Sequence, residues 1–227
     1  MCLGDSARPW WESTCPTFPP RTALPSVGGN APLIGVLALQ GDVREHRLML
    51  ESLGADVVEV RQPSQLTGLS GLVLPGGESS VMDKLMRIFG LREPLIALID
   101  EGIPVLATCA GMILLAAELE DGIDGQQTLG AMDITVKRNA FGSQRESFDV
   151  SLTIAGWETP VDVSFIRAPV VTRVGEGIEV KAKLDDGRVV AVENDSMTAL
   201  AFHPEVTGET RFHREFLNRA GAYASAR

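Results

Sequence analysis

The chain has 227 residues, 44% of them hydrophobic, which is enough for one α/β domain with a sizeable core and too few for two. A formal net charge of -10 argues against a nucleic-acid partner, because such binding relies on clustered Lys and Arg. The three cysteines indicate no disulfide framework, and no apolar run reaches the roughly 20 residues of a membrane span, so we expect a cytoplasmic protein.

Residues 1–32 differ in composition from the rest of the chain. They hold six of the 13 prolines and two of the three tryptophans, together with Cys2 and Cys15, and they have neither helical nor strand periodicity. The basic start and continuous apolar segment of a secretory signal are missing. We therefore predict a flexible N-terminal extension over residues 1–32 and a single folded domain over residues 33–227.

The first predicted elements of that domain are a strand, a helix and a second strand. Residues 33–39 form a short apolar run, typical of a strand buried on both faces. Asp42 and Glu45 resemble a capping box, and apolar residues then recur at helical spacing until Gly54 ends the helix. The next strand is predicted over residues 56–60.

The same alternation continues along the chain, with strands predicted at 71–74 and 104–108 and helices at 79–89 and 93–100. Alternating β and α segments predict an α/β fold. We expect three layers of the flavodoxin-like type, in which helices cover both faces of a mixed, mostly parallel sheet.

After about residue 128 the sequence changes to short β-like runs, which we expect to extend the sheet as antiparallel strands. These runs are 134–137, 149–154, 161–166, 178–182 and 189–193, and residues 197–200 are also strand-like. The last element, 207–220, has a polar start and apolar residues at helical spacing. It is predicted to be a terminal helix.

The strongest chemical signal is a cysteine between an apolar strand and an apolar helix. Val105 to Thr108 lead through Cys109, Ala110 and Gly111 into the apolar residues 112–117. Small neighbours permit a sharp turn, and the N-terminus of the following helix favours the thiolate, so this pattern predicts a nucleophile elbow. Taken alone, the pattern also fits a buried structural cysteine, since free cysteines are among the most buried residues.

The second signal is a histidine two residues before a glutamate. Pro204 fixes the backbone between His203 and Glu205, so both side chains can leave the strand end on the same side. By itself His203 could be an ordinary turn histidine, with Glu205 merely favouring a helix N-terminus. Together with Cys109, the pair fits a nucleophile, general base and orienting carboxylate.

A glycine pair in residues 71–80 gives the third signal. The strand ends in Pro75-Gly76-Gly77 before a predicted helix, and such a loop can present bare N–H groups. The amides of Gly77 and Ala110 are the candidates for an oxyanion hole, which needs two donors where negative charge develops. The alternative is a plain turn before a capped helix.

At this point the sequence resembles a known family, the class I or triad glutamine amidotransferases. The elbow, the Pro-Gly-Gly loop and the His-Pro-Glu sequence carry the resemblance. Further segments look like those of the glutaminase subunits of pyridoxal 5'-phosphate synthases, over residues 33 to 220: 35–41 with His46, 75–79, 108–111, 138–142, 165–169 and 202–205.

The resemblance implies a glutamine site with two groups of contacts. Gly77, Glu78 and Ser79 would line it, and Arg138, Ile166 and Arg167 would also contact the substrate. An arginine can grip the α-carboxylate of glutamine with paired hydrogen bonds, although most arginines are simply solvated at the surface. One departure from the family pattern is Ala107, where the elbow usually has glycine, and we expect only slight crowding there.

The implied reaction is hydrolysis of L-glutamine to L-glutamate and ammonia. The implied partner is a (β/α)₈-barrel synthase subunit, in a hetero-oligomer that makes pyridoxal 5'-phosphate. That compound is then a product rather than a cofactor, and neither a cofactor nor a metal ion is expected. Three alternatives remain at this stage: a glutaminase of another synthase such as imidazole glycerol phosphate synthase, an unrelated cysteine hydrolase or peptidase, and a non-catalytic regulatory module of the same fold.

Overall fold

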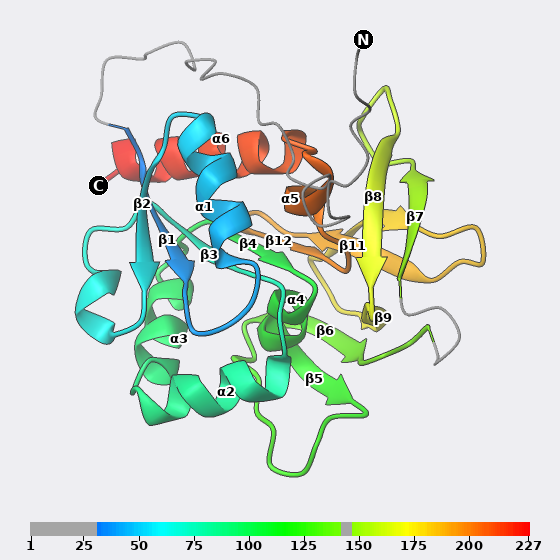
Figure 1. Cartoon of the computed structure of the whole chain (residues 1–227), viewed down its shortest axis with the longest axis horizontal. Helices are drawn as coiled ribbons and strands as arrows, with labels where there is room; N and C mark the ends of the chain where they lie inside the picture. The colour runs from blue at the N-terminus through cyan, green and yellow to red at the C-terminus, as the bar shows by residue number, and fades with distance from the viewer. Residues whose placement is uncertain (1–30, 142–146) are drawn as a thin grey trace, which may run out of the picture.

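The computed structural model describes residues 31–141 and 147–227. The predicted extension therefore lies outside the described residues except for its last two positions, and so does Gly142 of the 138–142 segment. Figure 1 shows a central sheet with helices on both of its faces, so the predicted three-layer α/β architecture is confirmed. Among the described residues, no helix is long and apolar enough to cross a membrane.

One half of the main sheet consists of five parallel strands. Their order is β2 (Asp56–Val60), β1 (Leu33–Leu37), β3 (Gly71–Leu74), β4 (Val105–Thr108) and β12 (Met197–Leu200). Every residue of β3, β4 and β12 is buried. Their continuous apolar runs are those of strands covered on both faces, as the sequence predicts.

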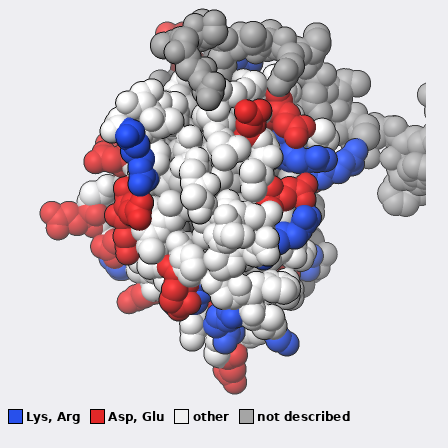
Figure 2. All heavy atoms as spheres, turned by 90° about the vertical axis from the view of Figure 1, so that its left-hand side faces the viewer, with Lys and Arg blue, Asp and Glu red and all other residues white. Residues whose placement is uncertain are grey.

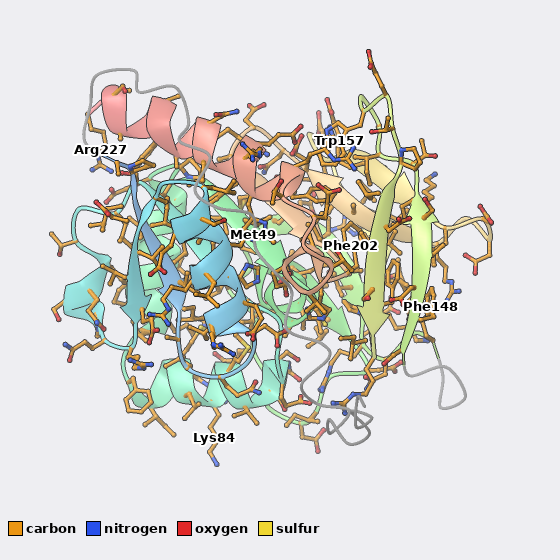
Figure 3. All side chains as sticks on the ribbon, turned by 45° about the horizontal axis from the view of Figure 1, so that its top comes forward. Met49, Lys84, Phe148, Trp157, Phe202 and Arg227 are labelled. Atoms are coloured by element: carbon orange, nitrogen blue, oxygen red, sulfur yellow. The ribbon has the colours of Figure 1, made fainter. Side chains whose placement is uncertain are left out.

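The helices divide between the two faces of the sheet (Figure 1). One face carries α1 (Val43–Ser52), α5 (Pro204–Thr207) and α6 (Arg211–Ser225), and the other carries α2 (Ser79–Ile88), α3 (Arg92–Asp100) and α4 (Ala110–Leu115). A short 3-10 helix, η2 (Pro63–Leu66), follows β2. In Figure 3, Met49 of α1 and Phe202 lie inside the molecule, where both are fully buried, whereas Lys84 of α2 points outward.

The other half of the main sheet is mixed. Beyond β12 it continues through β11 (Val189–Glu193), β9 (Val170–Val174), β6 (Met132–Lys137) and β5 (Ala116–Glu120), and β10 (Glu179–Lys183) pairs with β11. The pairs formed by β11 with β12, β9 and β10 are antiparallel, as is β9 with β6, but β5 runs parallel to β6. Antiparallel strands thus extend the sheet, as predicted.

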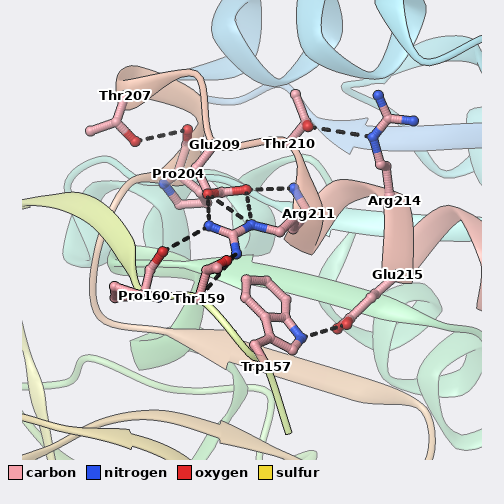
Figure 4. Close-up of polar contacts among 10 residues, drawn as sticks. All are labelled: Trp157, Thr159, Pro160, Pro204, Thr207, Glu209, Thr210, Arg211, Arg214 and Glu215. Carbon is pink, nitrogen blue, oxygen red and sulfur yellow. Dashed lines mark hydrogen bonds and ion pairs between the residues drawn. The ribbon is translucent and has the colours of Figure 1, made fainter. Parts of the chain in front are cut away.

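Two of the predicted strands do not join the main sheet. β7 (Ser147–Leu152) and β8 (Val161–Ile166) form a separate antiparallel pair. The loop between them is tied to α6, because Arg211 donates to the backbone oxygens of Thr159 and Pro160 at 3.1 and 3.0 Å (Figure 4). Trp157 Nε1 donates to Glu215 Oε1 at 2.7 Å, which adds a second tie.

Several sequence-based boundaries were wrong. The helix after the elbow ends at Leu115 instead of residue 117, because Ala116 turns to an extended conformation and begins β5. Strand β9 was not predicted. The predicted helix 207–220 is in fact two helices, since Gly208 ends α5 with a left-handed conformation (φ 76°) and α6 starts only at Arg211.

The predicted capping box at the start of α1 is also absent. Asp42 is the N-cap residue, but its side chain makes no capping hydrogen bond. Its carboxylate lies 3.2 Å from the Nδ1 atom of His203 instead. A contact between residues 161 positions apart in the chain overrides the local one, and Asp42 thereby becomes part of the site described next.

Candidate active site

The predicted site residues meet at one edge of the sheet. Strands β1, β3, β4 and β12 are mutually parallel, so their carboxyl ends lie at the same edge. The loop from Gln40 to Asp42 follows β1, the glycine pair follows β3, Cys109 follows β4 and His203 follows β12. Ligands in open α/β sheets bind outside the carboxyl ends of the strands.

Cys109 has the backbone of a sharp elbow. Its φ is 47° and its ψ is -102°, a conformation that costs free energy in a non-glycine residue and persists only where its surroundings impose it. Its N–H donates to Leu200 O of β12 at 2.7 Å, and α4 begins at the next residue. Gly111 permits the turn, because a Cβ there would lie 2.0 Å from Leu74 O.

The histidine and the glutamate are hydrogen-bonded as predicted. His203 Nδ1 lies 2.8 Å from Glu205 Oε1, and both side chains are buried. The nearby Asp42 carboxylate approaches the same nitrogen, at 3.2 Å. Gly76 packs directly on this ring, since a Cβ there would lie 2.3 Å from His203 Cε1. The two carboxylates therefore fix the Nδ1 side of the imidazole, leaving Nε2 for a reacting group.

The buried charges of this cluster support one another. Burial alone would lower the pKa of His203, but hydrogen bonds to Asp42, Cys109 and Glu205 raise it to about 12. Burial alone would raise the pKa of Glu205, but the neighbouring His46 and His203 hold it well below its usual range. His203 is therefore an imidazolium at neutral pH and Glu205 a carboxylate.

The glycine loop is held against the loop that follows β1. Asp42 N donates to Gly76 O at 3.1 Å, and Glu78 N donates to Gln40 Oε1 at 2.5 Å. A Cβ on Gly77 would lie 2.5 Å from that same Gln40 oxygen. Ala110, the second candidate donor, is the first residue of α4, where backbone N–H groups have no partner within the helix.

Three of the predicted glutamine contacts belong to one polar network. Arg138 pairs with Glu78 at 2.7 Å and donates to Gln126 Oε1 at 2.9 Å. Gln126 in turn donates to Ser79 Oγ at 3.0 Å. Arg138 is therefore a buried, paired arginine and is not merely solvated. Ser79 is only 2% exposed and joins the network through Gln126.

The remaining two predicted contacts lie at the end of β8. The backbone oxygen of Ile166 is 3.8 Å from Cys109 Sγ, within hydrogen-bond range for sulfur. Arg167 follows with φ 44° and an exposed side chain. The small two-stranded sheet thus contacts the cysteine directly through its backbone.

Several residues of the site were not singled out as site residues from the sequence, namely Gln40, Asp42, Thr108, Gln126 and His213, and His46 entered only through the family resemblance. His46 of α1 lies 3.4 Å from Glu205 Oε1, and His213 of α6 lies 2.9 Å from His46. A usable signal was the count of histidines: the chain has three, and all of them meet here.

Within residues 31–141 and 147–227, one group of side chains could surround a metal ion. Asp42, His203 and Glu205 each offer a ligand atom, and these atoms lie within 4.8 Å of one another. The hydrogen bond between His203 Nδ1 and Glu205 Oε1 already accounts for this closeness.

A hollow of about 520 Å³ lies elsewhere on the molecule. It is lined by residues of η2, α3 and the end of α6, including Leu66, Pro94 and Tyr223, and by Ser70 just before the amino end of β3. Figure 2, seen from the β2 side, shows few charged side chains at the centre of that face. The hollow borders the opposite ends of the strands from Cys109 and contains none of the site residues.

A doubly wound sheet with a cysteine elbow beside a buried histidine–glutamate pair defines a class of enzyme, the class I glutamine amidotransferases. Comparison with protein families identifies the particular family within this class. The model of the SNO glutamine amidotransferase family matches residues 36–221, and the chain belongs to that family.

Individual relatives agree with this assignment. The chain is 57% identical over 197 residues to the pyridoxal 5'-phosphate synthase subunit PdxT of Clavibacter sepedonicus, covering 86% of this chain and 94% of the relative. It is 53% identical to the subunit of the same name from Corynebacterium glutamicum over 192 residues, or 83% and 96%. A crystal structure of a glutamine amidotransferase has 46% identity and a TM-score of 0.77, covering 83% and 98%.

Proposed function

We propose that this chain is the glutaminase subunit of a pyridoxal 5'-phosphate synthase. It hydrolyses L-glutamine to L-glutamate and ammonia, and it hands the ammonia to a synthase subunit. Family membership and relatives of 52–57% identity support the activity and the pathway. The observation that carries the mechanism is the approach of Cys109, His203 and Glu205 at the edge of the sheet.

The first half of the reaction forms a thioester. The Cys109 thiolate attacks the side-chain amide carbon of glutamine, and the N–H groups of Gly77 and Ala110 donate hydrogen bonds to the resulting oxyanion. The His203 imidazolium then donates its proton to the departing nitrogen, and ammonia leaves as the carbon–nitrogen bond breaks. The raised pKa of His203 means that this proton is present at neutral pH.

The second half returns the enzyme to its starting state. His203, now neutral, accepts a proton from water while the water oxygen attacks the thioester carbon. The second tetrahedral intermediate expels the Cys109 thiolate and leaves glutamate. Glu205 keeps the imidazole oriented through both halves, because its Oε1 is bonded to Nδ1 at 2.8 Å.

Glutamine would be recognised by the charged network beside the glycine loop. A free amino acid carries both an α-carboxylate and an α-ammonium group, and Arg138 paired with Glu78 offers a partner of opposite charge for each. Gly77, Ser79 and the Ile166–Arg167 segment complete the proposed pocket. In this arrangement the substrate lies between the main sheet and the end of β8.

The proposed partner is a (β/α)₈-barrel subunit in a hetero-oligomer, since free ammonia is mostly protonated at neutral pH and must reach its acceptor under protection. A cytoplasmic location would keep the Cys109 thiol reduced, as the mechanism requires. We also propose that residues 33–227 form one glutaminase domain. The main sheet supports this, because its ten strands span from Leu33 to Leu200.

The experiment that tests the function measures glutamate release from glutamine by this chain with its synthase subunit. Cys109→Ala should abolish release while the circular dichroism spectrum stays unchanged. A Cys2→Ala/Cys15→Ala double variant is the matched control and should keep its activity. Release by Cys109→Ala at the rate of the unaltered chain would contradict the assignment.

A second measurement separates ammonia supply from synthesis. Pyridoxal 5'-phosphate formation is followed with either glutamine or an ammonium salt as the nitrogen source. The complex with Cys109→Ala should form product from the ammonium salt and none from glutamine. Loss of both reactions would point to a damaged complex, and product from glutamine would rule out Cys109 as the nucleophile.

A further inference from the structure

All three histidines of the chain lie in one buried cluster around Glu205. His203 bonds the carboxylate from the side of Cys109, as described above. His46 of α1 contacts the same carboxylate oxygen, His213 of α6 contacts His46, and neither histidine has any exposed surface. The catalytic scheme uses His203 alone, so the other two have no role in it.

The contacts of these two histidines form a chain. His213 Nε2 lies 2.9 Å from His46 Nδ1, and His46 Nε2 lies 3.0 Å from Thr108 Oγ1 of β4. The same Nε2 is 3.4 Å from Glu205 Oε1, the oxygen that bonds His203. Glu205 Oε1 therefore has two imidazole nitrogens near it, and Thr108 and Glu205 share the Nε2 atom of His46.

The unpartnered atoms indicate where the protons are. Among the described residues, His213 Nδ1 and Glu205 Oε2 are buried without a hydrogen-bond partner. A buried donor without an acceptor is rarer than a buried acceptor without a donor, so His213 Nδ1 is the unprotonated nitrogen. His213 Nε2–H then donates to His46 Nδ1, and His46 carries its own proton on Nε2.

We propose that His46 is a positioning residue for the reaction: its Nε2–H, oriented by His213, stabilises the ionised Glu205 carboxylate in the geometry that bonds His203. The inference rests on the proposed function, because it assigns a purpose to the second imidazole beside Glu205 Oε1. The result is a relay from His213 through His46 and Glu205 to His203.

The charge balance of the cluster agrees with this relay. His46 is among the groups that hold the pKa of Glu205 low. Burial, and the repulsion from any positive charge on His46, lower the pKa of His213 to about 3, so His213 stays neutral. From the described elements packed against His46, the titratable groups that face it are His213 on α6 and Glu205 on α5.

The first test is nuclear magnetic resonance of the whole chain labelled with ¹⁵N-histidine. Three imidazoles give a spectrum simple enough to assign with the single variants His46→Gln, His203→Gln and His213→Gln. The expected result is protonated Nε2 in both His46 and His213. An unprotonated His46 Nε2 would overturn the proposal, and this outcome depends on no activity measurement.

The second test compares two replacements of His46. His46→Leu removes the donor, whereas the amide of His46→Gln can replace Nε2–H. In the complex with the synthase subunit, His46→Leu should lower kcat for glutamine about tenfold with little change in KM, and His46→Gln should recover most of it. Equal losses in both variants would mean that His46 serves packing alone.

The rate at which iodoacetamide modifies Cys109 gives a readout without substrate. It is followed by mass spectrometry of the Cys109 peptide between about pH 5 and about pH 9. His46→Leu should change the pH profile in the same direction as Glu205→Gln, and by less. A change with Glu205→Gln only would reject the relay and keep the proposed function, whereas no change with either variant would count against both.

Discussion

The two halves of the main sheet differ in how they are built and in what they contribute. In the parallel half, β3, β4 and β12 are buried along their whole length, and the loops after them carry Cys109 and His203. In the mixed half, β6 has exposed residues at Asp133 and Lys137, and β8 in the small sheet alternates buried with more exposed positions. Arg138 follows β6, Ile166 is the last residue of β8, and Arg167 follows it. Fully buried strands thus hold the reacting groups, and strands with exposed positions carry the proposed substrate contacts.

This division predicts that substitutions in the two parts have different consequences. Changes at the edge of the parallel half should reduce turnover and leave the fold intact. Changes where the small sheet packs on the parallel half should reduce stability first.

The largest expected effect is on turnover. Glu205→Gln keeps the shape of the side chain but removes the charge that orients and stabilises the His203 imidazolium. We expect kcat to fall about a thousandfold, with an unchanged circular dichroism spectrum. Glu209→Gln is the matched control: this glutamate is in the same segment but pairs with Arg211, and its variant should keep nearly full activity. A similar loss in both variants would contradict the role of Glu205.

The next effect is on stability where the small sheet packs on the parallel half. Phe165 of β8 stacks on Phe148 with ring centroids 4.9 Å apart and meets Phe202 edge-on at 5.6 Å. Phe165→Ala should lower the free energy of unfolding by about 3–5 kcal/mol, measured by urea denaturation. Phe89→Ala, at a phenylalanine that is 51% exposed, should change it by less than about 0.5 kcal/mol. A small loss at Phe165 would mean that the small sheet is packed loosely.

A smaller effect should appear in the dependence of stability on pH. Burial, together with His46, lowers the pKa of His213 from 6.5 to about 3. The unfolded chain therefore binds a proton that the folded chain does not, and stability falls as the pH drops below about 6.5. At about pH 5, the lowered pKa of His213 alone reduces the free energy of unfolding by about 2 kcal/mol.

Replacement of His213 tests that contribution. His213→Gln cannot gain the proton, so the free energy of unfolding should depend less on pH between about pH 7 and about pH 5. Glu205, whose pKa is lowered, adds a loss of stability in acid that the variant keeps. His203 acts in the opposite direction, because its raised pKa gives stability that is complete below about pH 6.5 and is lost progressively as the pH rises from there to about 12. Identical pH dependence in the variant and the unaltered chain would show that folding does not lower the pKa of His213.

The smallest expected effect is at the tie between the small sheet and α6. Trp157→Phe removes the 2.7 Å hydrogen bond to Glu215 but keeps a ring to pack on Phe212, whose centroid is 4.6 Å away. The free energy of unfolding should fall by about 1 kcal/mol, measured by urea denaturation. Glu215→Gln keeps an acceptor for the tryptophan and should cost less. If the glutamine variant costs more, charge rather than the hydrogen bond is what matters there.

The sequence by itself determined the parallel half and the identity of the reacting groups. A strand buried on both faces is an uninterrupted apolar run, so β1, β3 and β4 can be read directly. The elbow is a local pattern at the end of β4, and the His-Pro-Glu sequence is one that follows β12. The mixed half was harder, because β5 and β9 depend on partners distant in the chain. Local periodicity assigned Ala116 to a helix, whereas pairing with Met132 places it in a strand.

Only the tertiary structure decided what surrounds the reacting groups. The side chain of Asp42 makes no capping hydrogen bond and contacts His203 instead. His46 and His213, 167 positions apart, become hydrogen-bonded to each other. No local rule predicts such contacts, because they join side chains from separate helices that pack on one face of the sheet. A buried charge is costly unless it is paired, and the groups that pair with it come together only when the whole chain is folded.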